Sequence, residues 1–442
     1  MDVVVIDAVQ QDEPPTALLG CWLDAPCPGE NVDDYSFTVR GWAVGRDAAV
    51  QAFQVLDGER IVAAVAPNQH RPDIVASFGC ETEVGTAGFE ATVRTIELEP
   101  SFVVEVVVLL ADGTRVLMAT VGGRRSRLAL ERSPRLNPVM LTTIGRSGSK
   151  WLALLLSCHP SVVAFQPLAF EPHVATYWST VFRTLTDPQS YMRQIHAERL
   201  EERRWWLGDD VAPVLAPIEL GMASWLGSDA VHDLAAVCQQ RTEAFYLELA
   251  HRAGKGEVRY FAEKFLLDRV LLDLTLECFP DAREVILVRD FRDRLSSVFA
   301  WNERHGDHGF GHDAQMSKRR YLTERVLVDA RDLLERWQRQ GERAHLLRYE
   351  DLVVEPQATL AALFEYLDIA SDPATLDTVL EAAAKPGELS DSHRTVDDPL
   401  QTIGRWRRDL PPELADECNE ILGPVLGAFG YPLDTAAVET AG

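Results

Sequence analysis

Hydrophobic and polar positions divide this chain of 442 residues into a strand-rich part and a later part of alternating strands and helices. From about residue 16 to 123, short alternating or apolar runs are separated by Asp-Gly, Pro and Gly turns. This pattern is typical of an antiparallel, immunoglobulin-like β-sandwich, and Leu110–Thr114 has the composition of a hairpin turn. Residues 1–15 lack the pattern, and we expect them to be loosely attached.

The pattern changes after a basic linker, residues 124–137, which carries five arginines. The apolar run Pro138–Ile144 enters a glycine-bearing turn, Gly145–Ser149, which opens onto an amphipathic helix. A second continuous apolar run, Glu284–Val288, is typical of a buried parallel strand. Residues 138–432 are therefore predicted to form an α/β domain, a parallel sheet with flanking helices.

The turn at 145–149 has the features of an anion site. A strand, a glycine turn and a helix start together place free backbone N–H groups and the positive end of a helix dipole at one point. The residues expected to bind the anion there are Arg146, Ser147, Gly148, Ser149, Lys150 and Trp151. The turn is not a Walker A loop, because the lysine is displaced and no magnesium-binding hydroxyl follows it. The motif favours a phosphate-bearing donor handled without magnesium; the alternative is a plain structural turn.

A second motif follows the strand Glu284–Val288. Arg289 stands at its carboxyl end, where open α/β sheets bind ligands. In the next helix Ser297 lies roughly 200° around the axis from the inward-facing Leu295, at about 3.6 residues per turn. Arg289 and Ser297 can therefore reach one small anion. The alternative is a salt-bridged arginine and a surface serine.

Together the two motifs resemble the bacterial branch of the sulfotransferases that use 3′-phosphoadenosine 5′-phosphosulfate (PAPS). The first is similar to that family's 5′-phosphosulfate loop and the second to its 3′-phosphate motif. Two further segments match, HLLRYEDLVVEPQATLAALFEYLDI (345–369) and TIGRWRRDL (402–410), so the resemblance covers about 138–432. One departure is Lys150, where the family has Thr or Ser.

The resemblance implies a P-loop-like sulfotransferase fold, PAPS as donor and no metal. It implies that Arg146 neutralises the leaving phosphate and that Arg289 and Ser297 bind the 3′-phosphate. It also implies that Arg394, Gly404 and Arg405 close over that phosphate. Structural roles for these last three residues remain open.

A base must take the proton of the acceptor. The family has a His after a Lys before the second motif, but here Lys264 is followed by Leu266 at the place of the His. The other family position falls in QPLAFEPH (166–173), where Glu171 is the favoured base and His173 the next candidate. Glu263 is a third candidate, and an ion-paired structural role is open for it.

Three short elements of the N-terminal part, RGWA (Arg40–Ala43), HRPD (His70–Asp73) and AGF (Ala87–Phe89), resemble a module attached to bacterial polysaccharide-building glycosyltransferases. We expect these residues to stabilise the sandwich rather than to bind a ligand, and Trp42 to lie in its core.

Charge and cysteine usage limit the class of protein. The net charge of −25 argues against a nucleic-acid binder, so an anionic nucleotide must be attracted locally. Seven scattered cysteines without CxxC spacing, with no signal peptide and no apolar run of 18 residues, predict reduced thiols in a cytoplasmic protein with no membrane span. His305, His308 and His312 stand in a glycine-rich stretch that favours a loop over a metal site.

The sequence thus predicts a sulfotransferase that acts on a hydroxyl or amine of a small-molecule or glycan acceptor, bound by the helix-rich residues 174–256. Trp205 and Trp206 there could stack on a sugar or simply pack. The rivals are a small-molecule kinase, which lacks its Walker lysine, and a non-catalytic glycan-binding scaffold. The acceptor's identity and the oligomeric state stay open.

Overall fold

The computed structural model describes residues 3–78, 86–164, 173–186, 228–265, 267–306, 316–384 and 398–433. The chain forms two compact units: Met1–Arg132 with Thr180–Cys238, and Ser133–Ser179 with Gln239–Gly442. Helices α3 (Val174–Leu185) and α8 (Ala230–Arg252) contribute residues to both units.

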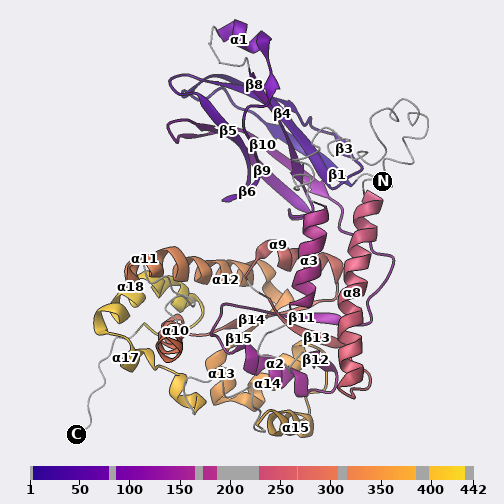
Figure 1. Cartoon of the computed structure of the whole chain (residues 1–442), viewed down its shortest axis with the longest axis vertical. Helices are drawn as coiled ribbons and strands as arrows, with labels where there is room; N and C mark the ends of the chain where they lie inside the picture. The colour runs from indigo at the N-terminus through magenta and orange to yellow at the C-terminus, as the bar shows by residue number, and fades with distance from the viewer. Residues whose placement is uncertain are drawn as a thin grey trace. The chain divides into compact units, whose positions relative to one another are not determined.

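Two antiparallel sheets make up most of the first unit (Figure 1). The six-stranded sheet has the order β3 (Asn31–Val32), β1 (Val4–Gln10), β10 (Arg115–Arg125), β9 (Ser101–Leu110), β5 (Val50–Asp57), β6 (Arg60–Val65). The four-stranded sheet has the order β2 (Leu18–Ala25), β4 (Ser36–Gly45), β8 (Thr86–Arg94), β7 (Gln69–His70), and helix α1 (Pro72–Phe78) lies between β7 and β8 in sequence. The predicted antiparallel β-structure is confirmed, including the turn between β9 and β10.

The core of this unit lies between its two sheets. Phe53 of β5 stacks on Phe89 of β8 with ring centroids 3.9 Å apart, and Phe37 of β4 stacks on Phe102 of β9 at 5.8 Å. All four rings are buried, so each sheet presents its apolar face to the other.

One expectation about this unit was wrong, and a second is confirmed only in part. Residues 1–15 are not loosely attached throughout, because β1 pairs with β10 over six residue pairs and also with β3. These pairings are non-local and leave little trace in the local pattern. Trp42 lies outside the core between the two sheets, because on β4 it alternates with the buried Val39 and Ala43. It packs instead against a smaller apolar cluster of Val44, Ile74 and Ala87 on the outer side of the four-stranded sheet.

The second unit is built on a parallel five-stranded sheet. Its order is β12 (Val162–Ala164), β13 (Tyr260–Phe265), β11 (Asn137–Thr143), β14 (Arg283–Val288), β15 (Ala344–Arg348). Parallel pairing aligns the carboxyl ends of these strands at one edge. The predicted α/β fold is confirmed, and the two expected strands begin one residue earlier than the sequence indicates.

Helices cover both faces of this sheet (Figure 1). Along β14 the side chains of Val285 and Leu287 pack into one apolar cluster, while those of Ile286 and Val288 pack into the other. The first cluster includes α2 (Ser149–Cys158), α13 (Tyr349–Val354), α14 (Pro356–Tyr366) and α15 (Pro373–Ala384). The second includes α10 (Phe291–His305), α11 (Lys318–Tyr321), the π-helical turn Leu322–Val326, α12 (Leu327–Gln340), α17 (Trp406–Asp409) and α18 (Pro412–Ala428). Burial on both faces explains why these strands are continuously apolar.

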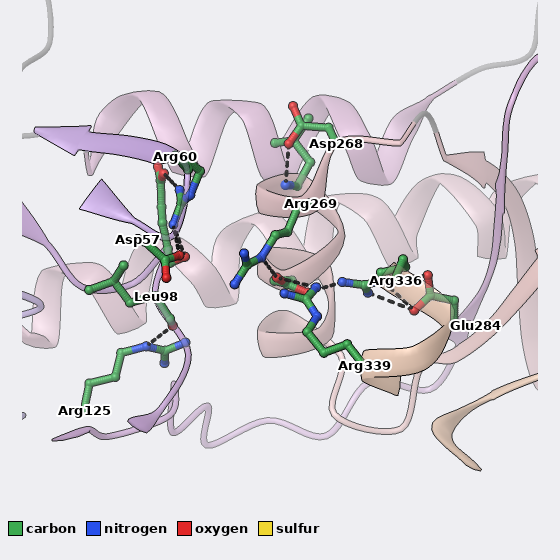
Figure 2. A network of polar contacts seen from close by, with 12 residues as sticks. Asp57, Arg60, Leu98, Arg125, Asp268, Arg269, Glu284, Arg336 and Arg339 are labelled. Carbon is green, nitrogen blue, oxygen red and sulfur yellow. Dashed lines mark hydrogen bonds and ion pairs between the residues drawn. The ribbon is translucent and has the colours of Figure 1, made fainter. Parts of the chain in front are cut away.

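A buried carboxylate at the start of β14 is paired within this unit. Glu284, 1% exposed, forms an ion pair of 2.8 Å with Arg336 of α12, as Figure 2 shows. Arg336 also contacts Asp273 of α9 (Arg269–Cys278), which pairs with Arg339 at 3.1 Å. Because a buried charge is costly without its partner, this network holds α9 and α12 against the sheet. It lies toward the amino end of β14, away from the carboxyl edge.

Candidate active site at the carboxyl edge of the parallel sheet

The turn after β11 is the one that the sequence analysis predicts to bind an anion, and we call it the anion loop. Arg146 and Gly148 adopt positive φ angles of 71° and 91°, and α2 begins at Ser149. Gly148 is the N-cap of α2, and no side chain caps this helix start. The first intrahelical hydrogen bonds run from the N–H groups of Trp151 and Leu152 to the carbonyl of Gly148, both at 3.1 Å. The turn before Trp151 therefore places the positive end of the helix dipole where an anion can bind.

Helix α10 fixes the side chain of Arg146. Its Nε and Nη2 donate to Ser297 Oγ at 3.2 and 3.1 Å, and its Cζ lies 4.7 Å from the centre of the Trp301 ring. Ser297 and Trp301 are four residues apart, so they lie on one helix face. The two predicted motifs therefore meet at the Arg146 guanidinium.

Arg289 is buried beside the same loop, with 5% of its surface exposed. Its guanidinium lies 4.6 Å from the Tyr349 ring centre and donates to the carbonyls of Arg146 at 3.2 Å and Thr402 at 3.0 Å. Among the described residues, Arg289 Nε has no hydrogen-bond partner. A buried N–H without an acceptor is costly, so this atom marks a place for a ligand oxygen.

Tyr349, the first residue of α13, links three parts of the site. A Cβ placed on Gly148 would lie 2.5 Å from Tyr349 Cδ2, so the ring packs directly against the loop. The hydroxyl of Tyr349 is 3.1 Å from Thr402 Oγ1, and its ring has an edge contact with Trp151. The aromatic ring thus contacts the loop, Arg289 and the segment around Thr402 together.

Positive charges repel one another in this site. Burial, and then the charges of Arg289 and Arg405, lower the pKa of Arg146 to about 10. Burial also lowers the pKa of Arg294, whose Nε donates to the carbonyl of Gly145 at 2.8 Å. Like charges concentrated at an uncapped helix start are stabilised when an anion binds. The residues present therefore fit a ligand with several negative charges.

The segment after residue 398 is held by α10. The carboxylate of Asp293, 1% exposed, accepts the N–H of Gly404 at 2.7 Å and that of Trp406 at 2.9 Å. Burial and the neighbouring Asp290 raise the pKa of Asp293 to about 7. Arg405 pairs with Asp409 at 2.6 Å. Arg394, the third residue expected here, lies outside the described residues.

The remaining loop residues contribute backbone rather than exposed side chains. Ser147 Oγ donates to the carbonyl of Ile144 at 2.8 Å and closes the turn. Ser149 is buried and Lys150 is half-buried at the start of α2. Both residues remain candidates for binding the anion.

The candidates for the base differ in their surroundings. Glu171 and Leu266 lie outside the described residues. His173 Nδ1 is 2.9 Å from the carbonyl oxygen of Lys264, so Nδ1 is the donor and a neutral ring keeps its lone pair on Nε2. Lys264 itself is half-buried near the carboxyl end of β13.

Glu263 has a structural setting. Its carboxylate accepts the N–H groups of Ala175 and Thr176 at 2.9 and 3.1 Å and the hydroxyl of Tyr246 at 2.6 Å. It therefore caps the start of α3, and burial raises its pKa.

Sequence reasoning missed four residues of this site: Trp301, Tyr349, Thr402 and Asp293. The spacing of Ser297 and Trp301 on one helix could have found the tryptophan. Asp293 lies in α10, four residues after Arg289, and could have been found in the same way. Tyr349 and Thr402 fall in the two further segments that resemble the family, but their contacts with the loop depend on the pairing of β14 with β15 and on the path of the C-terminal segment.

Within the described ranges, no group of three or more His, Cys, Asp or Glu side chains could hold a metal ion. His308 and His312 lie outside those ranges. None of the described helices combines the length and apolarity that a bilayer crossing needs.

The model of the Sulfotransferase family matches residues 138–373, more than half of the chain. The chain belongs to this family, and the matched range contains the anion loop, Arg289, Ser297 and Tyr349. No curated protein matches the chain.

Solved structures with similarity to this chain include further sulfotransferases. The sulfotransferase domain of the Synechococcus PCC 7002 olefin synthase is 19% identical, with 70% of this chain and 100% of that chain covered and a TM-score of 0.39. The domain from the curacin biosynthetic pathway is 18% identical, with coverages of 68% and 100% and a TM-score of 0.38. Mouse sulfotransferase SULT7A1 complexed with PAP is 11% identical, with coverages of 67% and 86% and a TM-score of 0.35.

Proposed function

We propose that this sulfotransferase transfers the sulfuryl group of PAPS to a hydroxyl or amine of a carbohydrate acceptor. The observation that carries the choice of donor is the meeting of Arg146, Ser297 and Arg289 at the uncapped start of α2. Two phosphate positions follow from it, one at the loop and one beside Arg289.

The chemistry needs charge stabilisation and one proton transfer. The acceptor oxygen or nitrogen forms a bond to sulfur while the bond from sulfur to the leaving phosphate oxygen breaks. Arg146 and the N–H groups of residues 147–150 stabilise the charge that grows on that phosphate, while the N–H of Trp151 donates to the carbonyl of Gly148. The acceptor's proton passes to the base, which we assign to Glu171 with His173 as the alternative.

The carbohydrate acceptor is supported by the sequence likeness of the N-terminal module to modules of polysaccharide-building glycosyltransferases. A sugar offers hydroxyls of the required kind. The other acceptor class, a small molecule without sugar, is an outcome of the activity assay below.

The donor is tested by calorimetry with adenosine 3′,5′-bisphosphate and 5′-AMP, which differ only in the 3′-phosphate. The bisphosphate should bind at least tenfold more tightly. Arg289→Gln and Ser297→Ala should reduce that preference, since a charge-assisted hydrogen bond contributes about 1.5–3 kcal/mol. Ser296→Ala is the matched control, because Ser296 Oγ donates to the carbonyl of Arg292 within its own helix. Equal binding of the two nucleotides would overturn the assignment of the donor.

The acceptor is tested by incubating the full chain with PAPS labelled in its sulfate and a panel of oligosaccharides and phenols. Label in an oligosaccharide supports the proposal. Label found only in non-sugar compounds would replace the acceptor class and leave the donor assignment intact.

A further inference from the structure

The RGWA, HRPD and AGF elements, which the sulfotransferase reaction does not use, meet on the outer face of the four-stranded sheet. Trp42 of β4 is the register partner of Gly88 of β8 and of Trp22 of β2. A Cβ on Gly88 would lie 2.8 Å from Arg71 Cγ, so the aliphatic part of the Arg71 side chain lies over the sheet at that glycine. Residues from three separate motifs therefore form one surface, which we call the Trp22 face.

Aromatic side chains gather on the Trp22 face. Trp22 is 53% exposed, and its partner Trp42 is half-buried with its ring centre 5.7 Å from that of Phe78 in α1. A Cβ on Gly20 would lie 2.7 Å from Phe78, so this glycine lets the rings approach the sheet. Trp22 and Phe78 are the exposed large aromatic residues among the described residues of the first unit, and both lie on this face. Gathered exposed aromatics mark a binding surface, whereas scattered ones do not.

Charged groups held in fixed positions border the rings. Arg71 Nη1 donates to Asp24 at 2.9 Å, and Arg71 Nη2 forms an ion pair with Asp73 at 2.9 Å. The register of β2 shifts at Asp24, so its place follows from its contact: it accepts from Arg71, whose aliphatic part lies over Gly88 of the same face. Each carboxylate uses part of its acceptor capacity on Arg71 and can accept hydroxyl hydrogen bonds with the rest.

The charges on this face compensate one another. Arg71 is balanced by its two aspartates, and Arg40 of β4 lies 3.8 Å from Glu90 of β8. With three carboxylates and two guanidinium groups, the surface has no positive excess to attract an anion. A flat tryptophan with fixed hydrogen-bonding groups beside it suits a ligand that has both C–H faces and hydroxyls.

We propose that the Trp22 face binds a neutral saccharide chain, with a pyranose ring stacked on Trp22 and its hydroxyls bonded to Asp24 and Arg71. This site is separate from the donor site and needs neither Arg289 nor the anion loop. It gives the N-terminal unit a binding role, in place of the purely stabilising one expected from the sequence.

The test measures binding to the full chain by calorimetry and saturation-transfer NMR. The probes are the neutral hexasaccharides of β-1,4-glucose, α-1,4-glucose, β-1,4-mannose and β-1,4-N-acetylglucosamine, together with a sulfated heparin hexasaccharide. At least one neutral probe should bind, with the sulfated probe weaker.

Variants locate the binding. Trp22→Ala should weaken it at least tenfold and Asp24→Asn by a smaller factor, while Trp22→Tyr, which keeps a stacking ring, should retain most of it. Val103→Ala is the matched control, an exposed apolar residue of β9 in the other sheet. Thermal unfolding of each variant checks the fold, and Asp24→Asn carries the test if Trp22→Ala fails to fold.

Three results would overturn the proposal. They are the absence of binding to every neutral probe at millimolar concentration, affinity unchanged in Trp22→Ala, and tighter binding of the sulfated probe. Arg289→Gln should bind the saccharide as the wild type does. The experiment therefore distinguishes a wrong assignment of the donor site from a wrong assignment of the Trp22 face.

Discussion

The ring of Tyr349 occupies the space that a side chain at Gly148 would need, because a Cβ there would lie 2.5 Å from Cδ2 and 2.8 Å from Cε2. The same ring lies 4.6 Å from the guanidinium carbon of Arg289. One side chain therefore lies between the loop proposed for the 5′-phosphosulfate and the arginine proposed for the 3′-phosphate.

Gly148→Ala should damage the donor site more than the same substitution at Gly145 does. Gly148 has a φ of 91°, which costs an alanine roughly 1–2 kcal/mol, and its new Cβ would also collide with Tyr349. We expect at least a tenfold loss of affinity for adenosine 3′,5′-bisphosphate, measured by calorimetry.

Gly145→Ala is the control, since a Cβ on Gly145 meets no atom within 4 Å. Its affinity for adenosine 3′,5′-bisphosphate should stay within about threefold of that of the wild type. This corresponds to a change in binding free energy of less than about 1 kcal/mol. Similar losses in the two variants would show that the Tyr349 contact does not shape the loop.

Substitutions of Tyr349 should separate the contribution of its hydroxyl from that of its ring. Tyr349→Phe removes only the bond to Thr402, a neutral hydrogen bond of about 0.5–1.5 kcal/mol, so nucleotide affinity should fall about two- to tenfold. Tyr349→Leu also removes the stacking on Arg289 and should cost clearly more. If the two substitutions lower the affinity for adenosine 3′,5′-bisphosphate equally, the Tyr349 ring does not contribute to nucleotide binding.

The sequence predicted the positions of those candidate residues whose placement depends on their neighbours in the chain. The anion loop and Arg289 follow directly from a strand and a helix start, so their positions could be predicted to within one or two residues. Tyr349 could not, because it reaches the loop only through the parallel pairing of β14 with β15. The same reason explains β1, whose partner strand β10 begins more than a hundred residues later in the sequence.

Trp42 shows a different limit of sequence reasoning. In RGWA an apolar residue in an alternating strand is expected to face the core, but the inner row of β4 contains Gly41, where a Cβ would collide with the carbonyl oxygen of Trp22 on β2 and crowd Met118. The alternation itself was correct, but the inward and outward positions were exchanged, because a glycine rather than the tryptophan occupies the inward position. The pattern of polar and apolar residues alone does not distinguish the core between the sheets from the smaller apolar cluster on the outer face.

Asp293 should make stability depend on pH. Its pKa in the folded chain is about 7, above the ordinary value of 3.8, so the folded state holds a proton that the unfolded state releases between these values. The stability contributed by this group is present below about pH 4 and is lost as the pH rises to 7, by at most about 1.4 kcal/mol per pH unit.

The measurement compares the free energy of unfolding of the wild type with that of Asp293→Asn between pH 4 and 8. The wild type should lose stability relative to the variant as the pH rises, and the difference should level off above pH 7. A constant difference across this range, or one that grows in favour of the wild type, would contradict the raised pKa.

The last prediction concerns the base. The sequence favours Glu171, and Glu171→Gln keeps the shape of the side chain while removing its basicity. Turnover should fall about a hundredfold to ten-thousandfold, the usual contribution of a positioned base, with affinity for adenosine 3′,5′-bisphosphate nearly unchanged. His173 is the competing candidate, because the Lys264 carbonyl at Nδ1 leaves Nε2 able to accept a proton. Measuring kcat against pH for Glu171→Gln and His173→Ala decides between them: if the glutamine variant keeps near-normal turnover and His173→Ala abolishes it, the base is His173.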